Sequence, residues 1–264
     1  EVLQQLRKTL RNHIFETDLT REGRLERTFE KLVQGTKSHA EFRADFAAVL
    51  LDLRENGLLD DNLSRDLIHG YYASVSYMDA MIGDLIKGLE DSGLRENTTI
   101  VLWSDHGYFL GEHGFWCKHS TFYEAVQIPL IISSPKYSTA DNSDSFTELV
   151  DIYPTLCELA GIDPPSYIQG KSLTPVLENP NTIIKNEIYT RYKQGEAVID
   201  ENYSYTEFFQ GKNYLGNMLY DMKNDKKQNK DISKLPENLE LVIKYRIKLK
   251  RMRDFVNEDP FQND

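Results

Sequence analysis

Residues 100–119, with the sequence IVLWSDHGYFLGEHGFWCKH, join a strand-like apolar run to a dense polar segment. The run 100–103 is continuously apolar and contains β-branched residues, which predicts a strand buried on both faces. An amphipathic helix is predicted directly before it, over about residues 65–92, with Gly93 placed to end it. A helix that leads into a buried strand is typical of an α/β sheet.

The segments on either side predict further elements. Apolar residues spaced at three and four positions predict helices in the charged N-terminal segment 1–61. A second apolar run at 128–132 predicts another strand, and residues 143–160 predict another helix. The Tyr-rich alternation near the end of the chain predicts short strands followed by a basic helix. These last elements are expected at 187–192, 197–209, 218–220 and 238–255.

The composition argues against several classes of protein. Lys and Arg number 31 against 42 Asp and Glu, so the net charge of the 264 residues is −11. Nucleic-acid and anionic-membrane binders need a basic face, so we expect neither partner. No apolar run is long enough for a transmembrane helix, and Cys117 and Cys157 make neither a disulfide framework nor a zinc set. The N-terminus has no apolar signal core and no initial Met, so we expect a mature or cut product.

The chemistry-bearing residues gather directly after the predicted strand at 100–103. Three of the six histidines of the chain lie within residues 106–119, together with carboxylates, a lysine and glycines. In open α/β sheets, ligands bind at the carboxyl ends of the strands. A carboxylate beside an imidazole, here Asp105 and His106, suits calcium or magnesium if other ligands come from elsewhere. Alternatively, Asp105 caps a turn and His106 is a hydrogen-bonded polar residue.

The other polar residues of this segment are open to two interpretations each. Lys118 is a point charge that can bind a sulfate- or phosphate-like group, or a solvated surface lysine. His113 and His119 are acid/base or substrate-contact candidates, or hydrogen-bonded loop residues. Cys117 lies beside Lys118 and His119, but no orienting partner is evident, which favours an idle thiol. Nucleophile-elbow, P-loop, His-Glu-x-x-His and Cys-x-x-Cys motifs are all absent from the sequence.

The segment SDHGYFLGEHGFWCKHSTFYEA at 104–125, followed by QIPLIISSP at 127–135, resembles the sulfatase family of the alkaline-phosphatase superfamily. The resemblance is closest to bacterial iduronate-2-sulfatase-like enzymes, and it covers about residues 62–232. It implies a mixed sheet sandwiched by helices, with a small C-terminal antiparallel sheet packed by the last helix. The implied division is a charged helical segment at 1–61, the C-terminal part of the sulfatase α/β domain at 62–180, and a smaller α+β subdomain at 181–264.

The resemblance also assigns roles to the polar segment. Asp105 and His106 resemble the family's metal ligands, usually for calcium, with magnesium also possible. Lys118 is similar to a catalytic lysine that contacts the sulfate group, and His119 and His113 resemble substrate contacts to the sugar. The implied chemistry is the hydrolysis of a sulfate ester, in which a formylglycine hydrate attacks sulfur while the metal polarises the sulfuryl oxygens.

The sequence departs from the family pattern at the nucleophile. The formylglycine motif Cys/Ser-x-Pro-x-Arg and the family's N-terminal aspartate pair are both absent. We therefore expect a C-terminal sulfatase portion, either a fragment or one piece of a split enzyme, that is inactive alone and acts only with an N-terminal half. The apolar sheet edge that such a portion would expose also predicts association with a partner or with another copy of the chain. The implied substrate is a sulfated glycosaminoglycan sugar of the iduronate-2-sulfate type, and the implied location is periplasmic or extracellular. The alternatives are a non-catalytic protein that binds sulfated glycans and a phosphate or phosphonate ester hydrolase.

Overall fold

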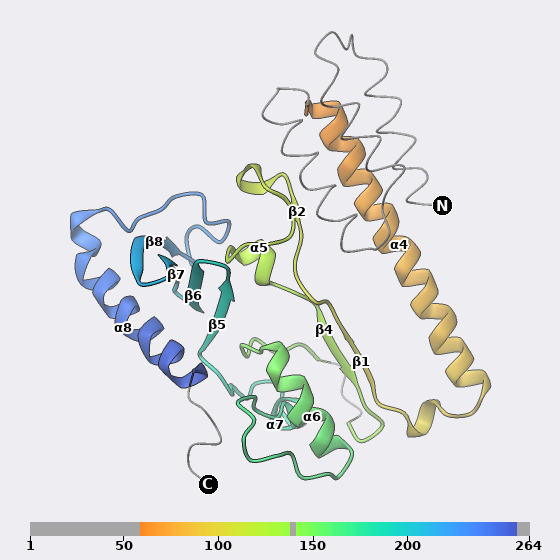
Figure 1. Ribbon diagram of the computed structural model, residues 1–264. Helices are drawn as coiled ribbons and strands as arrows, with labels where there is room; N and C mark the ends of the chain where they lie inside the picture. The colour runs from red at the N-terminus through yellow and green to blue at the C-terminus, as the bar shows by residue number, and fades with distance from the viewer. Residues whose placement is uncertain (1–58, 138–140, 258–264) are drawn as a thin grey trace. The chain divides into compact units, whose positions relative to one another are not determined.

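The computed structural model describes residues 59–137 and 141–257, drawn in colour in Figure 1. The chain forms two compact units. The first holds the described residues up to Thr98 together with Tyr108–Lys118, and the second holds Thr99–Gly107 and the described residues from His119 onward. The helices predicted within residues 1–58 lie outside the described residues. The predicted domain boundaries at residues 61 and 180 stay a prediction.

The long helix of the first unit confirms the helix predicted around residues 65–92. Helix α4 spans Asp61–Asp91, and the carboxylate of Asp60 caps it by accepting hydrogen bonds from the backbone N–H groups of Asn62 and Leu63. At its other end Gly93 adopts a φ of 72°, a left-handed conformation that favours glycine. The amides of Gly93 and Leu94 donate to the carbonyls of Glu90 and Leu89, so the helix ends in a Schellman motif. The short 3-10 turn η1 (Arg95–Asn97) follows.

The apolar stripe of α4 is only partly covered by described residues. Leu63 and Leu67 are buried, and Tyr71 stacks on Tyr108 with ring centroids 4.8 Å apart. Leu85, by contrast, is 74% exposed. The rest of this unit is a small hairpin in which β2 (Phe109–Leu110) pairs antiparallel with β3 (Trp116–Cys117) across the 3-10 turn η2 (Glu112–Gly114).

In the second unit, the two predicted apolar runs form an antiparallel pair. Strand β1 (Ile100–Trp103) pairs with β4 (Leu130–Ser133), in a register that places Ile100 opposite Ser133. The prediction that the first run is buried on both faces is wrong. No residue of β1 is fully buried, and Trp103 is 49% exposed. Ile131, which lies opposite Leu102 and thus on the other face from Trp103, is 57% exposed, so neither face of this sheet, two-stranded among the described residues, is fully covered.

The helix predicted over 143–160 begins later than expected. Residues 141–148 are irregular, η3 (Leu149–Asp151) starts the helical turn, and α6 spans Ile152–Leu159. The start is set by a capping box in which Glu148 and Asp151 each accept a hydrogen bond from the other's backbone N–H. Two further short helices belong to this unit, α5 (Tyr123–Val126) and α7 (Thr174–Glu178).

The C-terminal sheet is a four-stranded antiparallel meander in the order β5-β6-β7-β8. Its strands are β5 (Glu187–Tyr192), β6 (Gly195–Asp200), β7 (Tyr203–Gln210) and β8 (Asn213–Asp221). The predicted strand 197–209 is thus two strands, because the Asp200 carboxylate accepts from the amides of Asn202 and Tyr203 and closes a turn there.

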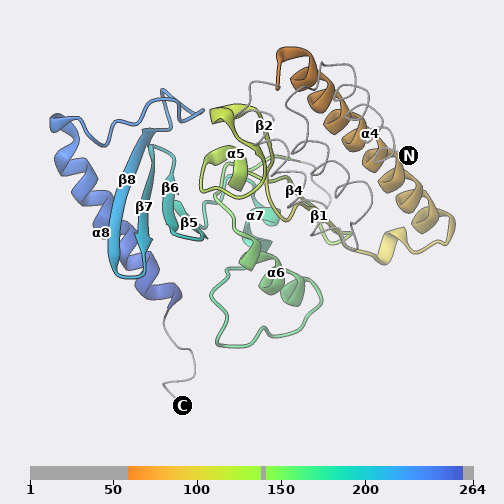
Figure 2. The same cartoon turned by 45° about the horizontal axis from the view of Figure 1, so that its top comes forward.

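The last helix covers one face of this sheet. Helix α8 (Leu239–Val256) follows the turn η4 (Pro236–Asn238) and runs along the sheet in Figure 2. The buried core between them consists of Val198, Tyr205, Leu219, Val242, Tyr245 and Leu249. The predicted combination of mixed α/β structure, a small antiparallel sheet and a C-terminal helix is confirmed. Within the described residues, no helix is long and apolar enough to cross a membrane.

Candidate functional site

The Asp105–His106 pair lies in a tight turn directly after β1. The Ser104 hydroxyl donates to the backbone oxygen of His106 at 2.9 Å, and the amide of Gly107 donates to the Ala125 carbonyl at 2.7 Å. A Cβ on Gly107 would stand 2.0 Å from the Glu124 oxygen, so only glycine fits this approach. The turn is therefore fixed in place while Asp105 stays exposed and His106 half-buried.

The hydrogen bond of His106 determines which ring nitrogen can meet a cation. Its Nδ1 lies 2.9 Å from the Gly107 oxygen. Because a carbonyl only accepts, Nδ1 carries the proton in this bond, and in the neutral ring Nε2 then has the free lone pair. Metal-ligating histidines are typically held in this way, with one N–H on a carbonyl and the other nitrogen on the ion.

The donor set fits a divalent ion in part. One exposed carboxylate and one oriented imidazole can serve as two ligands, as predicted for Asp105 and His106. Calcium takes six to eight ligands, and the described residues contain no group of three or more His, Cys, Asp or Glu side chains that could hold a metal. A complete shell would need ligands from outside these residues.

His119 is brought next to His106 by the structure, and both belong to the second unit. The two ring centroids lie 6.2 Å apart. On β5, the ring of Tyr192 stacks on His119 with centroids 5.2 Å apart and an interplanar angle of 18°. Sequence reasoning missed Tyr192, although the Tyr-rich strand that it ends was predicted. The stack joins two residues that are far apart in the sequence, and hydrophobic periodicity does not reveal such a contact.

His113 and Lys118 belong to the first unit, so the boundary between the units falls within the predicted site. His113 lies in η2, and its ring meets Phe109 edge-on with centroids 6.3 Å apart. Lys118 is half-buried at the end of the β2–β3 hairpin. Burial raises the pKa of the neighbouring Cys117 thiol and outweighs the hydrogen bond from Tyr108 that lowers it. This supports the interpretation of Cys117 as an idle thiol.

Unusual backbone conformations are concentrated in this segment. Within the described residues, five non-glycine residues have a positive φ, and three of them are His113, Cys117 and His119, at 54°, 69° and 88°. A fourth, Lys193, directly follows Tyr192. Such conformations disfavour side chains with a Cβ and are typical of binding and catalytic segments, where packing holds them in place.

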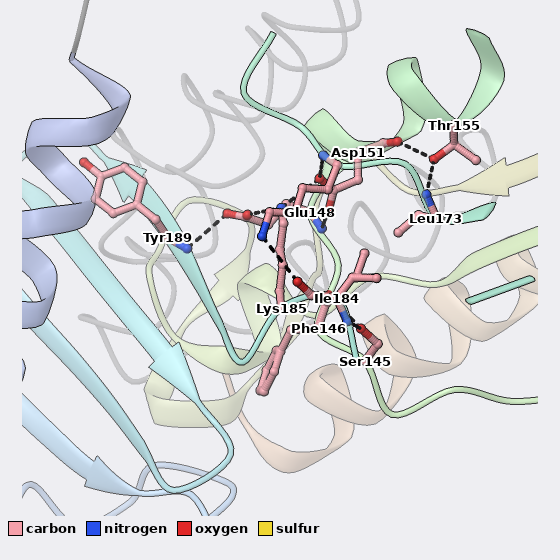
Figure 3. Close-up of polar contacts among 10 residues, drawn as sticks. Ser145, Phe146, Glu148, Asp151, Thr155, Leu173, Ile184, Lys185 and Tyr189 are labelled. Atoms are coloured by element: carbon pink, nitrogen blue, oxygen red, sulfur yellow. Dashed lines mark hydrogen bonds and ion pairs between the residues drawn. The ribbon is translucent and has the colours of Figure 1, made fainter. Parts of the chain in front are cut away.

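A separate buried ion-pair cluster supports the start of α6 (Figure 3). The Lys185 ammonium lies 2.5 Å from Glu148 and 2.7 Å from Asp151, and Asp151 is fully buried. Glu148 also lines a cleft of about 420 Å³ together with residues such as Asp144 and Ser145. None of the predicted site residues lines this cleft, so the cluster serves as scaffold.

Two sulfatase family models match the chain. The model described as Sulfatase matches residues 10–162, and the model described as N-sulphoglucosamine sulphohydrolase, C-terminal, matches residues 111–255. An N-acetylglucosamine-6-O-sulfatase of Bacteroides thetaiotaomicron is 38% identical over 173 residues, which covers 61% of this chain and 31% of the relative. Human iduronate 2-sulfatase is 35% identical over 134 residues, covering 41% and 24%. The chain thus spans less than a third of the length of these relatives.

Solved structures agree with this relationship. One, a complex with its substrate D-glucosamine-2-N,6-O-disulfate, is 27% identical with a TM-score of 0.70, and the match covers 94% of this chain and 56% of that chain. Together with other sulfatase structures, it confirms the predicted alkaline-phosphatase-like α/β fold. Because the Sulfatase model matches more than half of its residues, the chain belongs to the sulfatase family.

Proposed function

We propose that this chain is part of a sulfuric ester hydrolase that acts on sulfated glycosaminoglycan sugars. The observation that carries the proposal is the turn after β1, where His106 is held by its Nδ1 so that Nε2 can meet a cation beside Asp105. The substrate class is supported by similarity to an N-acetylglucosamine-6-O-sulfatase, to iduronate 2-sulfatases and to a structure holding a disulfated glucosamine. Within that class we favour the iduronate-2-sulfate type.

Each site residue has a distinct role in this proposal. Asp105 and His106 would hold a divalent cation, calcium or alternatively magnesium, which when bound polarises the sulfuryl oxygens. The ammonium of Lys118 would meet the anionic sulfate and steady the leaving oxygen. His119 and His113 would contact the sugar. With a net charge of −11 on the chain, attraction for a polyanion must come from these local groups and not from the overall field.

We further propose that the chain does not turn over substrate by itself. The sequence has no Cys/Ser-x-Pro-x-Arg motif from which a formylglycine nucleophile could form. The family chemistry would then need an N-terminal sulfatase half, on the same polypeptide or on a partner, because a second copy of these residues would lack the motif as well. We expect the working protein in the periplasm or outside the cell, which fractionation of the source cells would test.

The missing nucleophile motif also favours a second candidate function, the binding of sulfated glycans without cleavage. Hydrolysis of phosphate or phosphonate esters has weaker support. Two phosphonate monoester hydrolases share the fold, but at 22% and 23% identity they support no more than the fold.

A turnover assay separates these functions. The purified chain is incubated with a chromogenic aryl sulfate and calcium, with and without the N-terminal half of a related sulfatase. We expect no turnover by the chain alone and turnover when the halves are mixed. Turnover by the chain alone would contradict the proposed dependence. Binding of a sulfated sugar without turnover in either mixture would favour the non-catalytic candidate.

A further inference from the structure

We propose that Tyr192 is a positioning residue that holds the His119 ring in place for contact with the substrate. The inference extends the site to the turn between β5 and β6, which carries none of the predicted site residues. The stack of Tyr192 on His119 is a property of the protein without ligand. Its consequence for sugar binding rests on the proposed function.

The direct observation is the stack between the two rings. The centroids of His119 and Tyr192 lie 5.2 Å apart, and the planes are 18° from parallel. Offset stacking at this separation is a favoured arrangement for aromatic pairs. His119 is exposed, and the stacked ring of Tyr192 is one restraint on where its imidazole lies. The ring of His106 also lies near it, with centroids 6.2 Å apart and planes 64° from parallel.

Tyr192 is well placed to act as a fixed support. It is the last residue of β5 and pairs with Gly195 across the turn. A Cβ on Gly195 would stand 3.0 Å from the Phe208 ring and 3.4 Å from the Thr121 methyl group, so the turn is closely packed. Strand β6, which begins at Gly195, is buried throughout. The ring that supports His119 therefore extends from a rigid sheet.

The chain that carries His119 is anchored to the same sheet. Thr121, two residues further on, is 4% exposed, and its hydroxyl lies 3.4 Å from the hydroxyl of Thr206 on β7. His119 itself has a φ of 88°, a conformation that a residue with a Cβ rarely adopts without support. The Thr121 contact anchors the backbone near His119, and the Tyr192 stack restrains its ring.

The turn also presents a positive charge beside the stack. The Lys193 ammonium lies 5.4 Å from the centroid of the Tyr192 ring, within the range of a cation–π contact. Lys193 is exposed and has a φ of 49°. An imidazole, an aromatic ring and an ammonium are thus adjacent, a combination suited to an anionic sugar.

The test compares Tyr192→Leu, which removes the ring, with Tyr192→Phe, which keeps it. The exposed Tyr72 on α4 supplies a matched control, Tyr72→Leu. The first readout is the NMR shift of the His119 ring protons, assigned with His119→Gln, in the absence of ligand. We expect the ring-current shift of these protons to be kept in Tyr192→Phe and Tyr72→Leu and lost in Tyr192→Leu. Unchanged His119 shifts in Tyr192→Leu would overturn the proposal.

The second readout is affinity for D-glucosamine-2-N,6-O-disulfate, measured by calorimetry. We expect Tyr192→Leu to weaken binding by up to about tenfold and Tyr192→Phe to bind like the wild type. Equal affinity of all variants would overturn the positioning role. If the wild-type chain binds neither this sugar nor an iduronate-2-sulfate, the proposed function fails, and the NMR shifts still decide the geometric part. If Tyr192→Leu does not fold, the nuclear Overhauser contacts between the two rings in the wild type decide, and their absence overturns the proposal.

Discussion

The Nζ atom of Lys185 lies 2.7 Å from Oδ1 of Asp151, whose side chain is completely buried. The same carboxylate accepts hydrogen bonds from the amides of Lys171 and Glu148, each at 2.8 Å. Glu148 in turn accepts from the amide of Tyr189 on β5 at 3.0 Å. One buried carboxylate and its partner therefore connect the start of α6 to two segments that follow it in the sequence (Figure 3).

Removing the cation from this cluster is predicted to destabilise the chain strongly. Lys185→Met leaves the buried carboxylate of Asp151 and the half-buried one of Glu148 without their ammonium partner, and an uncompensated buried charge typically costs about 3–5 kcal/mol. The free energy of unfolding from urea titration measures the loss. The control is Lys87→Met, which breaks the exposed pair with Asp91 and should cost less than about 1 kcal/mol. Similar losses in the two variants would contradict the scaffolding role.

A second prediction compares a closely packed glycine, Gly107, with one that faces open space, Gly88. Gly107→Ala places a methyl group 2.0 Å from the Glu124 oxygen, so the turn that carries Asp105 and His106 must shift. Gly88→Ala in α4 meets open space and should stabilise the helix by about 1 kcal/mol. The midpoint temperature of thermal unfolding should therefore fall for Gly107→Ala and rise for Gly88→Ala. A Gly107→Ala variant as stable as the wild type would show that the turn is less closely packed than described.

The pH dependence of stability is predicted to depend on Asp200. Burial alone raises the pKa of this carboxyl, but hydrogen bonds from Lys248, Tyr245 and the amides of Tyr203 and Asn202 outweigh it and hold the pKa below its usual 3.8. A depressed pKa stabilises the folded chain above the unfolded value, and this contribution is lost as the pH falls through the folded value.

The measurement is the free energy of unfolding of the wild type and of Asp200→Asn, from neutral pH down through pH 4 and below. The wild type should lose stability more steeply than the variant over the acidic part of this range, because only the wild type has this carboxylate to protonate. Parallel profiles for the two proteins would contradict the role of Asp200.

Cation binding is predicted to be weak and to depend on the turn after β1. Asp105 and His106 supply two ligands where calcium takes six to eight, so calorimetry with calcium should give at most low affinity. Asp105→Ala should abolish the remaining heat of binding. Asp84→Ala, on the exposed surface of α4, is the matched control and should titrate like the wild type. A titration unaltered by Asp105→Ala would remove this residue from the site.

Local signals made much of the fold predictable. The ends of α4 follow from a capping aspartate at Asp60 and a left-handed glycine at Gly93, both of which act within a few residues. The start of α6 was misplaced because its capping box is supported by Lys185, a partner 34 residues away from Asp151. The incomplete burial of β1 differs from the prediction, because the composition of a strand does not reveal what covers it.

In the candidate site, too, the features set by neighbouring residues were predictable and those set by distant residues were not. The position of Asp105 and His106 directly after β1 follows from the order of residues in the sequence. The stack of Tyr192 on His119 could not be predicted, because it depends on how the C-terminal sheet packs against residues 119–121. The roles of Lys118 and His113 stay predictions.

We propose that this sulfatase-family chain recognises the sulfate group of a sugar through the segment from Asp105 to His119. The most direct measurement is calorimetric binding of D-glucosamine-2-N,6-O-disulfate, with unsulfated D-glucosamine as the control ligand, to the wild type and to Lys118→Ala. We expect the wild type to bind only the sulfated one of these two sugars, and Lys118→Ala to weaken this binding by at least about tenfold through the loss of a charge-assisted contact. Equal binding of both sugars, or unchanged affinity in Lys118→Ala, would contradict it.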